Sequence, residues 1–242
     1  MPRGHEDWGV STSALNASPE IPTAELAARL GALSLYDQTG QLMFADGFEL
    51  GLAPYSLNPQ GTGASIVLVA GKSFLGAYSA KLTGGSDGLR YARLSKAFPR
   101  PFLTRWGVEA RAVLNSAGGD FMVNIRRYDG TNEHKWEVLI NLTSNAISVL
   151  QADGTYATVV ANSGYQHGPY IWHPLKLVVD LDGGGYVRLG FATLQLDLSA
   201  YSASLTASSN GASIDSDVGV NSDAGANPVV ELDSLIYTYN EP

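Results

Sequence analysis

The sequence predicts an all-β protein in which two antiparallel sheets pack face to face as a sandwich. Two segments alternate apolar and polar residues with a period of two, WGVEARAVL (106–114) and HKWEVLINL (134–142), as strands with one buried face do. Turn signals such as ADGT (152–155) and DGGG (182–185) separate further apolar runs, because glycine adopts positive φ without a steric penalty. About a dozen short strands at regular spacing are typical of a sandwich.

The chain divides into two parts. Residues 1–20 carry prolines and small polar residues without periodicity, which indicates an extended arm. The segment TAELAARLG that follows predicts one short helix, with Thr23 as its N-cap and Gly31 at its end. We therefore expect an N-terminal arm and short helix over 1–32 and a sandwich over 33–242.

Two later stretches bear on function. YIWHPLKLVVDLDGGGYVRLGFATLQLDLS (170–199) holds one histidine near two aspartates. On a strand, His173 shares a face with the core leucines, while Asp180 and Asp182 face the other way, so the histidine and the acids cannot form a general-base pair. We interpret this stretch as scaffold. The segment 202–228 is rich in Ser, Ala, Gly, Asn and Asp, which predicts a long loop.

Composition excludes several classes of function. The net charge is −8 and the 15 lysines and arginines are scattered, whereas binding to nucleic acid needs clustered cations. No run approaches the 18 apolar residues that would indicate a membrane span. The start, MPRGHEDWGV, lacks the apolar core of a secretory signal, so we expect use in a cytoplasm or export inside a particle. Cysteine is absent, which excludes disulfides and cysteine metal sites.

No catalytic residues are predicted. Jelly-roll glycosidases place paired carboxylates on one strand face, but Glu109 and Glu137 are lone acids with a cation nearby in sequence, and we interpret them as solvated surface groups. The four histidines have no Gly-x-Ser-x-Gly partner motif. The sequence therefore predicts a protein that is not an enzyme.

Four segments carry a resemblance to a known family. WHPLKLVVDLDGGGYVRLGFATLQLDLS (172–199) resembles the hairpin of concanavalin A-like (laminin-G-like) jelly rolls. MFADGFELG (43–51) resembles the opening strand of these domains. AYSAKLTGG (77–85) resembles their second strand, and VVELDSLIYTYNEP (229–242) resembles their closing strand. The resemblance covers residues 40–242 and implies a concanavalin A-like jelly-roll fold.

The layout of the first fifty residues resembles virion structural proteins of tailed phages and prophages. This resemblance implies a non-enzymatic capsid decoration or cementing protein, located in the virion after assembly in the host cytoplasm. The arm would bind the capsid or other virion proteins through Trp8, Val10 and Leu15. A symmetric homo-oligomer, and within that class a trimer, is expected.

Two alternatives stay open. One is a carbohydrate-binding module, for example on a tail fibre, that recognises a surface glycan through exposed rings at Tyr165, Tyr170 and Trp172; the other is a glycoside hydrolase. No cofactor is predicted apart from a structural calcium ion, because the resemblance brings three acids of the first and last strands into one neighbourhood: Asp46, Glu49 and Asp233.

Overall fold

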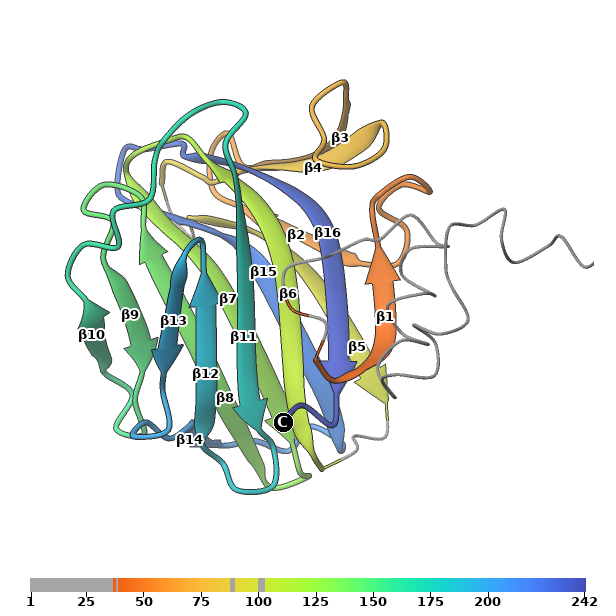
Figure 1. Ribbon diagram of the computed structural model, residues 1–242, viewed down its shortest axis with the longest axis vertical. Coiled ribbons are helices and arrows are strands. Elements are labelled where there is room, and N and C mark those ends of the chain that lie inside the picture. Colours follow the sequence, from red (N-terminus) through yellow and green to blue (C-terminus); the bar gives the residue numbers. More distant parts are fainter. Residues whose placement is uncertain (1–36, 38, 88–89, 100–102) are drawn as a thin grey trace, which may run out of the picture.

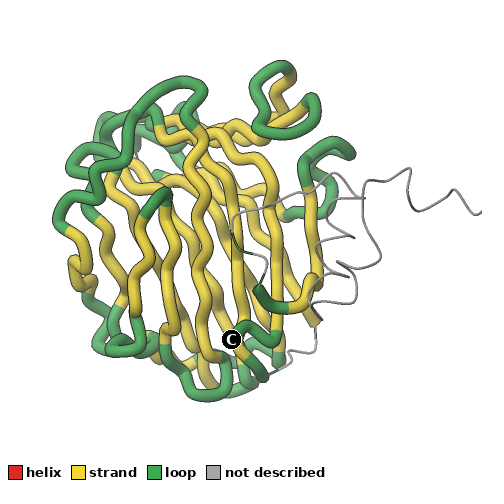
Figure 2. The backbone as a smooth tube through the Cα atoms, in the orientation of Figure 1, coloured by secondary structure: helices red, strands yellow, loops and turns green. Residues whose placement is uncertain are grey.

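The computed structural model describes residues 37, 39–87, 90–99 and 103–242, which form sixteen strands and no helix. Figure 2 shows the strands packed as two layers joined by loops. The all-β, two-sheet prediction is therefore confirmed. The predicted arm, the helix that follows it and the anchor residues Trp8, Val10 and Leu15 lie outside the described residues. Within the described part of the chain, no helix is long and apolar enough to cross a membrane.

Eight strands form sheet A, in the order β13-β12-β11-β6-β16-β4-β3, with β1 also paired to β16 (Figure 1). All neighbouring strands are antiparallel. Their bounds are β1 Gln41–Asp46, β3 Ser65–Ala70, β4 Tyr78–Thr83, β6 Arg105–Leu114, β11 Trp172–Asp180, β12 Tyr186–Phe191, β13 Leu194–Asp197 and β16 Val229–Tyr239.

The other eight strands form sheet B, in the order β10-β9-β8-β7-β15-β5-β2, with β14 paired to β8. These pairs are antiparallel too. Their bounds are β2 Ser56–Gln60, β5 Tyr91–Pro99, β7 Gly119–Tyr128, β8 Asn132–Asn141, β9 Ile147–Leu150, β10 Tyr156–Val160, β14 Ser204–Ala207 and β15 Ser213–Ser222.

The core lies between the sheets and follows the alternation in the sequence. On β6, Val108, Ala110 and Leu114 are fully buried, and on β8 Trp136 and Ile140 are fully buried. Because side chains on a strand alternate between faces, the residues between these point to the outer face of each sheet. The predicted strand periodicity is therefore confirmed in both sheets, and each sheet presents a second, outer face to the surroundings.

The predicted loop over 202–228 is wrong. This segment contains β14 and β15, and β15 is an inner strand of sheet B between β5 and β7. Its sequence SIDSDVGVNS does alternate: Ile214, Val218 and Val220 are buried in the core. The small and acidic residues between them are typical of loops, so the composition of this segment did not indicate a strand.

The stretch 170–199 folds as β11, a glycine turn, β12 and β13, so the predicted strand, turn and returning strands are confirmed. His173 is buried, and its Nε2 lies 2.8 Å from the backbone oxygen of Gln166. Burial holds the pKa of His173 below its usual value. Asp180 instead accepts hydrogen bonds from the amides of Asp182 and Gly183 in the turn.

Candidate functional site

The outer face of sheet B carries polar side chains in register across adjacent strands. Asp217 of β15 lies opposite Asn124 of β7, and Asn124 lies opposite Glu137 of β8. All three are almost fully buried, with 1–3% of their surface exposed, although they point away from the core. Tyr156 of β10 donates a short hydrogen bond to Glu137. We call Asp217, Asn124, Glu137 and Tyr156 the polar row.

Glu137 has three side-chain partners in the structure. Besides the Tyr156 hydroxyl, it contacts Asn124 Nδ2 at 3.2 Å and Lys135 Nζ at 2.8 Å. Burial by itself would raise the pKa of Glu137, but the Lys135 ammonium and the hydrogen bonds from Tyr156 and Asn124 outweigh it and hold the pKa below its usual value. Glu137 is therefore an ionised hydrogen-bond acceptor at neutral pH.

The core fixes the position of Glu137 from the other side. Tyr186 of β12 reaches from sheet A across the sandwich, and its hydroxyl accepts the backbone N–H of Glu137 at 2.8 Å. The same hydroxyl donates to the backbone oxygen of Leu150 at 2.8 Å. A rigid backbone at this point keeps the outward side chain in one orientation, which a binding or reactive site requires.

Asn124 and Asp217 continue the row, and Asp217 has unused hydrogen-bonding capacity. Asn124 Nδ2 lies 3.2 Å from both Glu137 and Asp217, and its Oδ1 accepts the backbone N–H of Asp217. Arg126 donates to Asp217 Oδ2 at 2.9 Å. Asp217 Oδ1 and Arg126 Nε are buried without a hydrogen-bond partner. Buried polar atoms are nearly always paired, so this part of the row has donor and acceptor capacity that no described residue uses.

Tyr156 ends the row with a ring that is 44% exposed. Burial of its hydroxyl and the neighbouring Glu137 carboxylate raise the pKa of Tyr156, so the phenol stays protonated. The positive charge of Arg93, which lies on β5, acts in the opposite direction.

Arg93 is held beside the polar row. Its guanidinium lies over the Tyr91 ring at 4.2 Å and donates to Asn221 at 2.9 Å. Gly219, directly opposite Arg93 on β15, leaves room for its stem, because a Cβ at Gly219 would lie 2.9 Å from Arg93 Cγ. Arg93 Nε is buried without a hydrogen-bond partner, so this cation also retains unused donor capacity.

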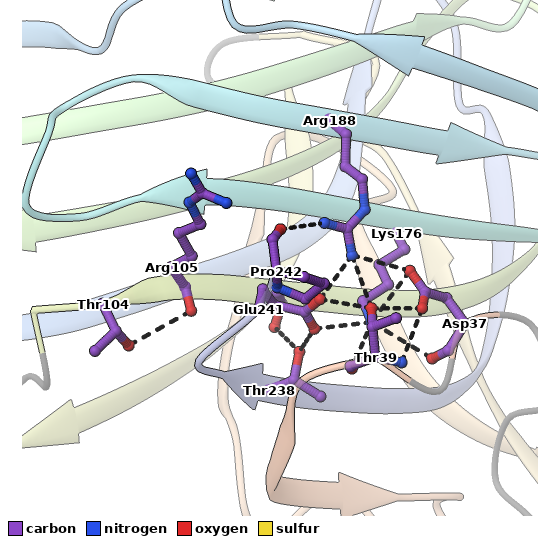
Figure 3. Close-up of polar contacts among 10 residues, drawn as sticks. Asp37, Thr39, Thr104, Arg105, Lys176, Arg188, Thr238, Glu241 and Pro242 are labelled. Atoms are coloured by element: carbon purple, nitrogen blue, oxygen red, sulfur yellow. Dashed lines mark hydrogen bonds and ion pairs between the residues drawn. The ribbon is translucent and has the colours of Figure 1, made fainter. Parts of the chain in front are cut away.

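The outer face of sheet A carries a different polar cluster, which Figure 3 shows. Lys176 of β11 pairs with Glu241 at 2.8 Å, and Arg188 of β12 pairs with the same carboxylate at 2.7 Å. Asp37 lies 3.4 Å from Lys176 and 3.2 Å from Arg188. Hydrogen bonds to Thr39 and the two cations overcome burial and lower the pKa of Asp37 to about 2.

We call this cluster the Lys176 network; it consists of Asp37, Thr39, Lys176, Arg188, Thr238 and Glu241. Thr238 donates to Glu241, and Gly107 provides the space, because a Cβ there would lie 2.8 Å from Glu241 Oε1. No side-chain atom of the network is buried without a partner among the described residues. The network holds Asp37, Thr39 and Glu241 against sheet A, which is a structural role.

The rings predicted to bind sugar lie in two environments. The ring of Tyr165 is buried against His173 and Phe191. The prediction of an exposed ring at this position is therefore wrong. Tyr170 is 72% exposed, and Trp172 packs against Phe74 on the outer face of sheet A, with ring centroids 6.5 Å apart. Trp172 begins β11 of sheet A, Tyr165 and Tyr170 lie in the connection between β10 and β11, and none of the three belongs to the polar row.

The three acids predicted to bind calcium mostly accept backbone amides. Glu49 accepts from Ala77 and Tyr78, and Asp233 accepts from Phe74 and Leu75. No group of three or more His, Asp or Glu side chains that could hold a metal occurs in the described part of the chain. However, Asp46 Oδ2 and Asp233 Oδ1 are buried without a partner, so each has an oxygen that suits a cation, and the calcium site stays a prediction.

The interpretation of Glu109 and Glu137 as solvated acids is wrong, since both are at most 3% exposed. Long neighbouring side chains on each sheet cover them. They lie on the outer faces of different sheets, so they do not face each other across one substrate. Burial raises the pKa of Glu109 to about 8, although Lys176 and Arg111 oppose this shift.

Sequence reasoning missed Asn124, Asp217, Arg126 and Arg93 as site residues. All four occupy outward positions of strands whose inward residues are largely apolar, and such positions normally face water. The available signal was their chemical type: FMVNIRR (121–127) and SIDSDVG (213–219) place amide, guanidinium and carboxylate groups at outward positions of two strands. Register between strands, which the sequence does not specify, was needed to align them.

Comparison with known proteins identifies the fold. No protein-family model and no curated protein matches the sequence. Among solved structures, "Cellulose induced protein, Cip1" is similar with a TM-score of 0.57 and 15% identity, over 81% of this chain and 97% of that one. An endo-β-1,4-glucuronan lyase from the fungus Trichoderma reesei is similar with a TM-score of 0.56 and 10% identity, over 83% of this chain and 96% of that one. Alginate lyase vAL-1 from Chlorella virus is similar with a TM-score of 0.50 and 10% identity, over 82% of this chain and 100% of that one. These likenesses support the jelly-roll sandwich assignment.

Proposed function

We propose that this protein binds carbohydrate on the outer face of sheet B, through the polar row and Arg93. The observation that carries this proposal is a set of buried, preorganised polar side chains that still have unpartnered atoms, beside an exposed tyrosine ring. Sugar hydroxyls are both donors and acceptors, and the apolar face of a sugar ring stacks on aromatic side chains. The similar structures named as glucuronan and alginate lyases make polysaccharides reasonable first ligands to test.

The charges favour recognition of a glycan without its cleavage. Lys135 offsets Glu137, and Arg126 offsets Asp217. Glu137 is held ionised with both oxygens hydrogen-bonded, and Tyr156 is held protonated. Neither group is prepared to exchange a proton near neutral pH. We therefore propose a binding protein and not a hydrolase or lyase.

The test is binding to a glycan array, followed by titration calorimetry with the best oligosaccharide. Changing Tyr156→Ala should weaken binding at least about tenfold, which corresponds to about 1.4 kcal/mol. Tyr170→Ala removes a more exposed ring that lies outside the polar row and should leave affinity unchanged. If the two variants behaved alike, or if no glycan bound, the proposal would be wrong.

We also propose, from the resemblance of its first fifty residues, that the protein is a virion component held by the arm containing Trp8, Val10 and Leu15. A glycan-binding face on sheet B is compatible with a particle-bound protein, because the arm and sheet B belong to different parts of the chain. Deletion of residues 1–20 should abolish particle association and leave glycan binding intact. Unchanged particle association would contradict the role of the arm.

A further inference from the structure

Strand β3 is a long, unprotected edge of sheet A. Among the described residues it pairs only with β4, in a continuous six-residue register from Ser65 to Ala70. Its other edge is a row of backbone N–H and C=O groups for which the described residues supply no partner. Such an edge is a template for a further strand.

The other edges of the sandwich carry features that discourage pairing. β2 contains Pro59, which lacks an N–H to donate. β1 and β10 are interrupted by shifts of register, and β13 and β14 have only four residues each. β3, with the sequence SIVLVA, has no proline, no charge and no bulge. It is the exception among the edges that the structure describes.

The side chains of β3 make this edge apolar on both faces. Val67 is 45% exposed and Leu68 is 36% exposed. Leu68 is on the core-facing side, since it lies opposite the buried Ala80 of β4, whereas Val67 lies opposite Lys81. Figure 1 shows that the β3–β4 hairpin extends beyond the neighbouring strands. A partner strand can therefore approach without meeting the rest of the molecule.

We propose that a second copy of this chain pairs antiparallel with β3, so that sheet A continues across a two-fold axis into its partner. A two-fold axis perpendicular to the sheet pairs each residue of β3 with a residue of the second copy whose side chain lies on the same face of the sheet. Centred on Val67, it brings Val67 against its own copy and Ile66 against Leu68. A neutral strand meets no like charge in this arrangement, and isologous two-fold contacts are the commonest in oligomers.

The expected dimer is concentration-dependent. Stable interfaces bury about 1,200–2,000 Å² in total, which is more than one six-residue strand supplies. The exposed rings of Phe74 and Tyr78, 41% and 37% exposed beside the ends of the hairpin, add apolar area but not a second interface. This proposal does not depend on the glycan site, which lies on sheet B.

The test is sedimentation equilibrium of the full chain over a range of concentrations. The unmodified protein should pass from monomer to dimer as concentration rises. Val67→Lys should remain monomeric, because a charge at an edge strand opposes pairing. Leu205→Lys changes an equally apolar side chain, 57% exposed on β14, and should dimerise like the unmodified protein. Circular dichroism checks that each variant folds.

Hydrogen exchange of the unmodified protein tests the same contact without a variant. Alternate amides of β3 should exchange more slowly at high than at low protein concentration, since their N–H groups become hydrogen-bonded in the dimer. The proposal is overturned by a protein that is monomeric at every concentration, by unchanged exchange in β3, or by a dimer or trimer that Val67→Lys leaves intact.

Discussion

The Lys176 network on sheet A and the polar row on sheet B both bury charged side chains, but they differ in how completely these are paired. On sheet A, Lys176 and Arg188 are matched by Glu241 and Asp37, and the network has no unpartnered buried atom. On sheet B, the polar row leaves Asp217 Oδ1 without a partner. A closed network stabilises a fold, whereas an open one retains capacity for a ligand. Buried charge therefore does not mark function by itself. Incomplete pairing also occurs on sheet A, at Arg111 Nε and Asp233 Oδ1, and what distinguishes the polar row is that its open atoms lie in line with the exposed Tyr156 ring.

The largest expected effect on stability comes from opening the closed network. Glu241→Ala leaves Lys176, which is 2% exposed, with Asp37 as its remaining carboxylate partner. Removing one member of a buried ion pair costs about 3–5 kcal/mol, and we expect about 3 kcal/mol here from urea denaturation. Asp182→Ala, an exposed turn acid, should cost less than about 0.5 kcal/mol. Similar losses for both variants would show that the network is not stabilising.

Asn124→Ala should separate binding from stability on the other face. Loss of its hydrogen bonds to Glu137 and Asp217 should cost about 1–3 kcal/mol of stability and abolish measurable glycan binding. Asn227, outside the polar row, also donates two side-chain hydrogen bonds. Asn227→Ala should therefore lose stability but keep affinity. Calorimetry and denaturation of both variants check this, and equal affinities would remove Asn124 from the site.

The two buried glutamates should respond to pH in opposite directions. The folded pKa of Glu109 is raised from 4.5 to about 8, so the folded state binds more protons than the unfolded state between these values. Its contribution to stability is present below pH 4.5 and is lost as the pH rises towards 8. The pKa of Glu137 is lowered, so its contribution is present above pH 4.5 and is lost as the pH falls through its folded pKa.

Thermal melts across pH check these opposite slopes. Glu109→Gln should flatten the decline in stability between pH 4.5 and 8, and Glu137→Gln should flatten the decline in acid. A variant that left the slope of its own region unchanged would contradict the assigned pKa direction for that residue.

The smallest expected effect concerns calcium. Asp46 and Asp233 each keep a buried oxygen without a partner, and we expect millimolar calcium to raise the melting temperature slightly and chelator to reverse this. Asp233→Asn should abolish the response. Identical melting temperatures with calcium and with chelator would remove the predicted site.

The fold class was predictable because its signal is local. The alternation of apolar and polar residues after Trp106 and around Trp136 indicates each strand from its own residues, and glycine turns such as 182–185 indicate where strands end. β15 escaped prediction because Ser216, Asp217 and Gly219 resemble loop residues when the adjacent strands are unknown. Asp217 and Gly219 lie on the outer face and Ser216 on the inner face of a strand that has a neighbour on each side, which is a property of the assembled sheet.

The candidate site was less predictable for the same reason. Asp217 and Asn124 are 93 residues apart in sequence, and a register shifted by one residue would turn either side chain to the opposite face. Glu137 was considered as a single acid, because Tyr156 and Asn124, which hold it ionised, come from other strands. Aromatic rings were proposed as sugar-binding residues from sequence alone, before their exposure was known. Tyr165 shows the weakness of this criterion, because its ring is buried in the structure.

The central claim, that the outer face of sheet B binds carbohydrate, is tested most directly by amide chemical-shift mapping during titration with an oligosaccharide identified on the array. The account predicts that the largest shifts fall on β7, β8 and β15 and on the side-chain amide of Asn124, with Lys176 and its neighbours unchanged. Shifts concentrated around Tyr170 and Trp172, or no shifts on sheet B at saturating ligand, would contradict it.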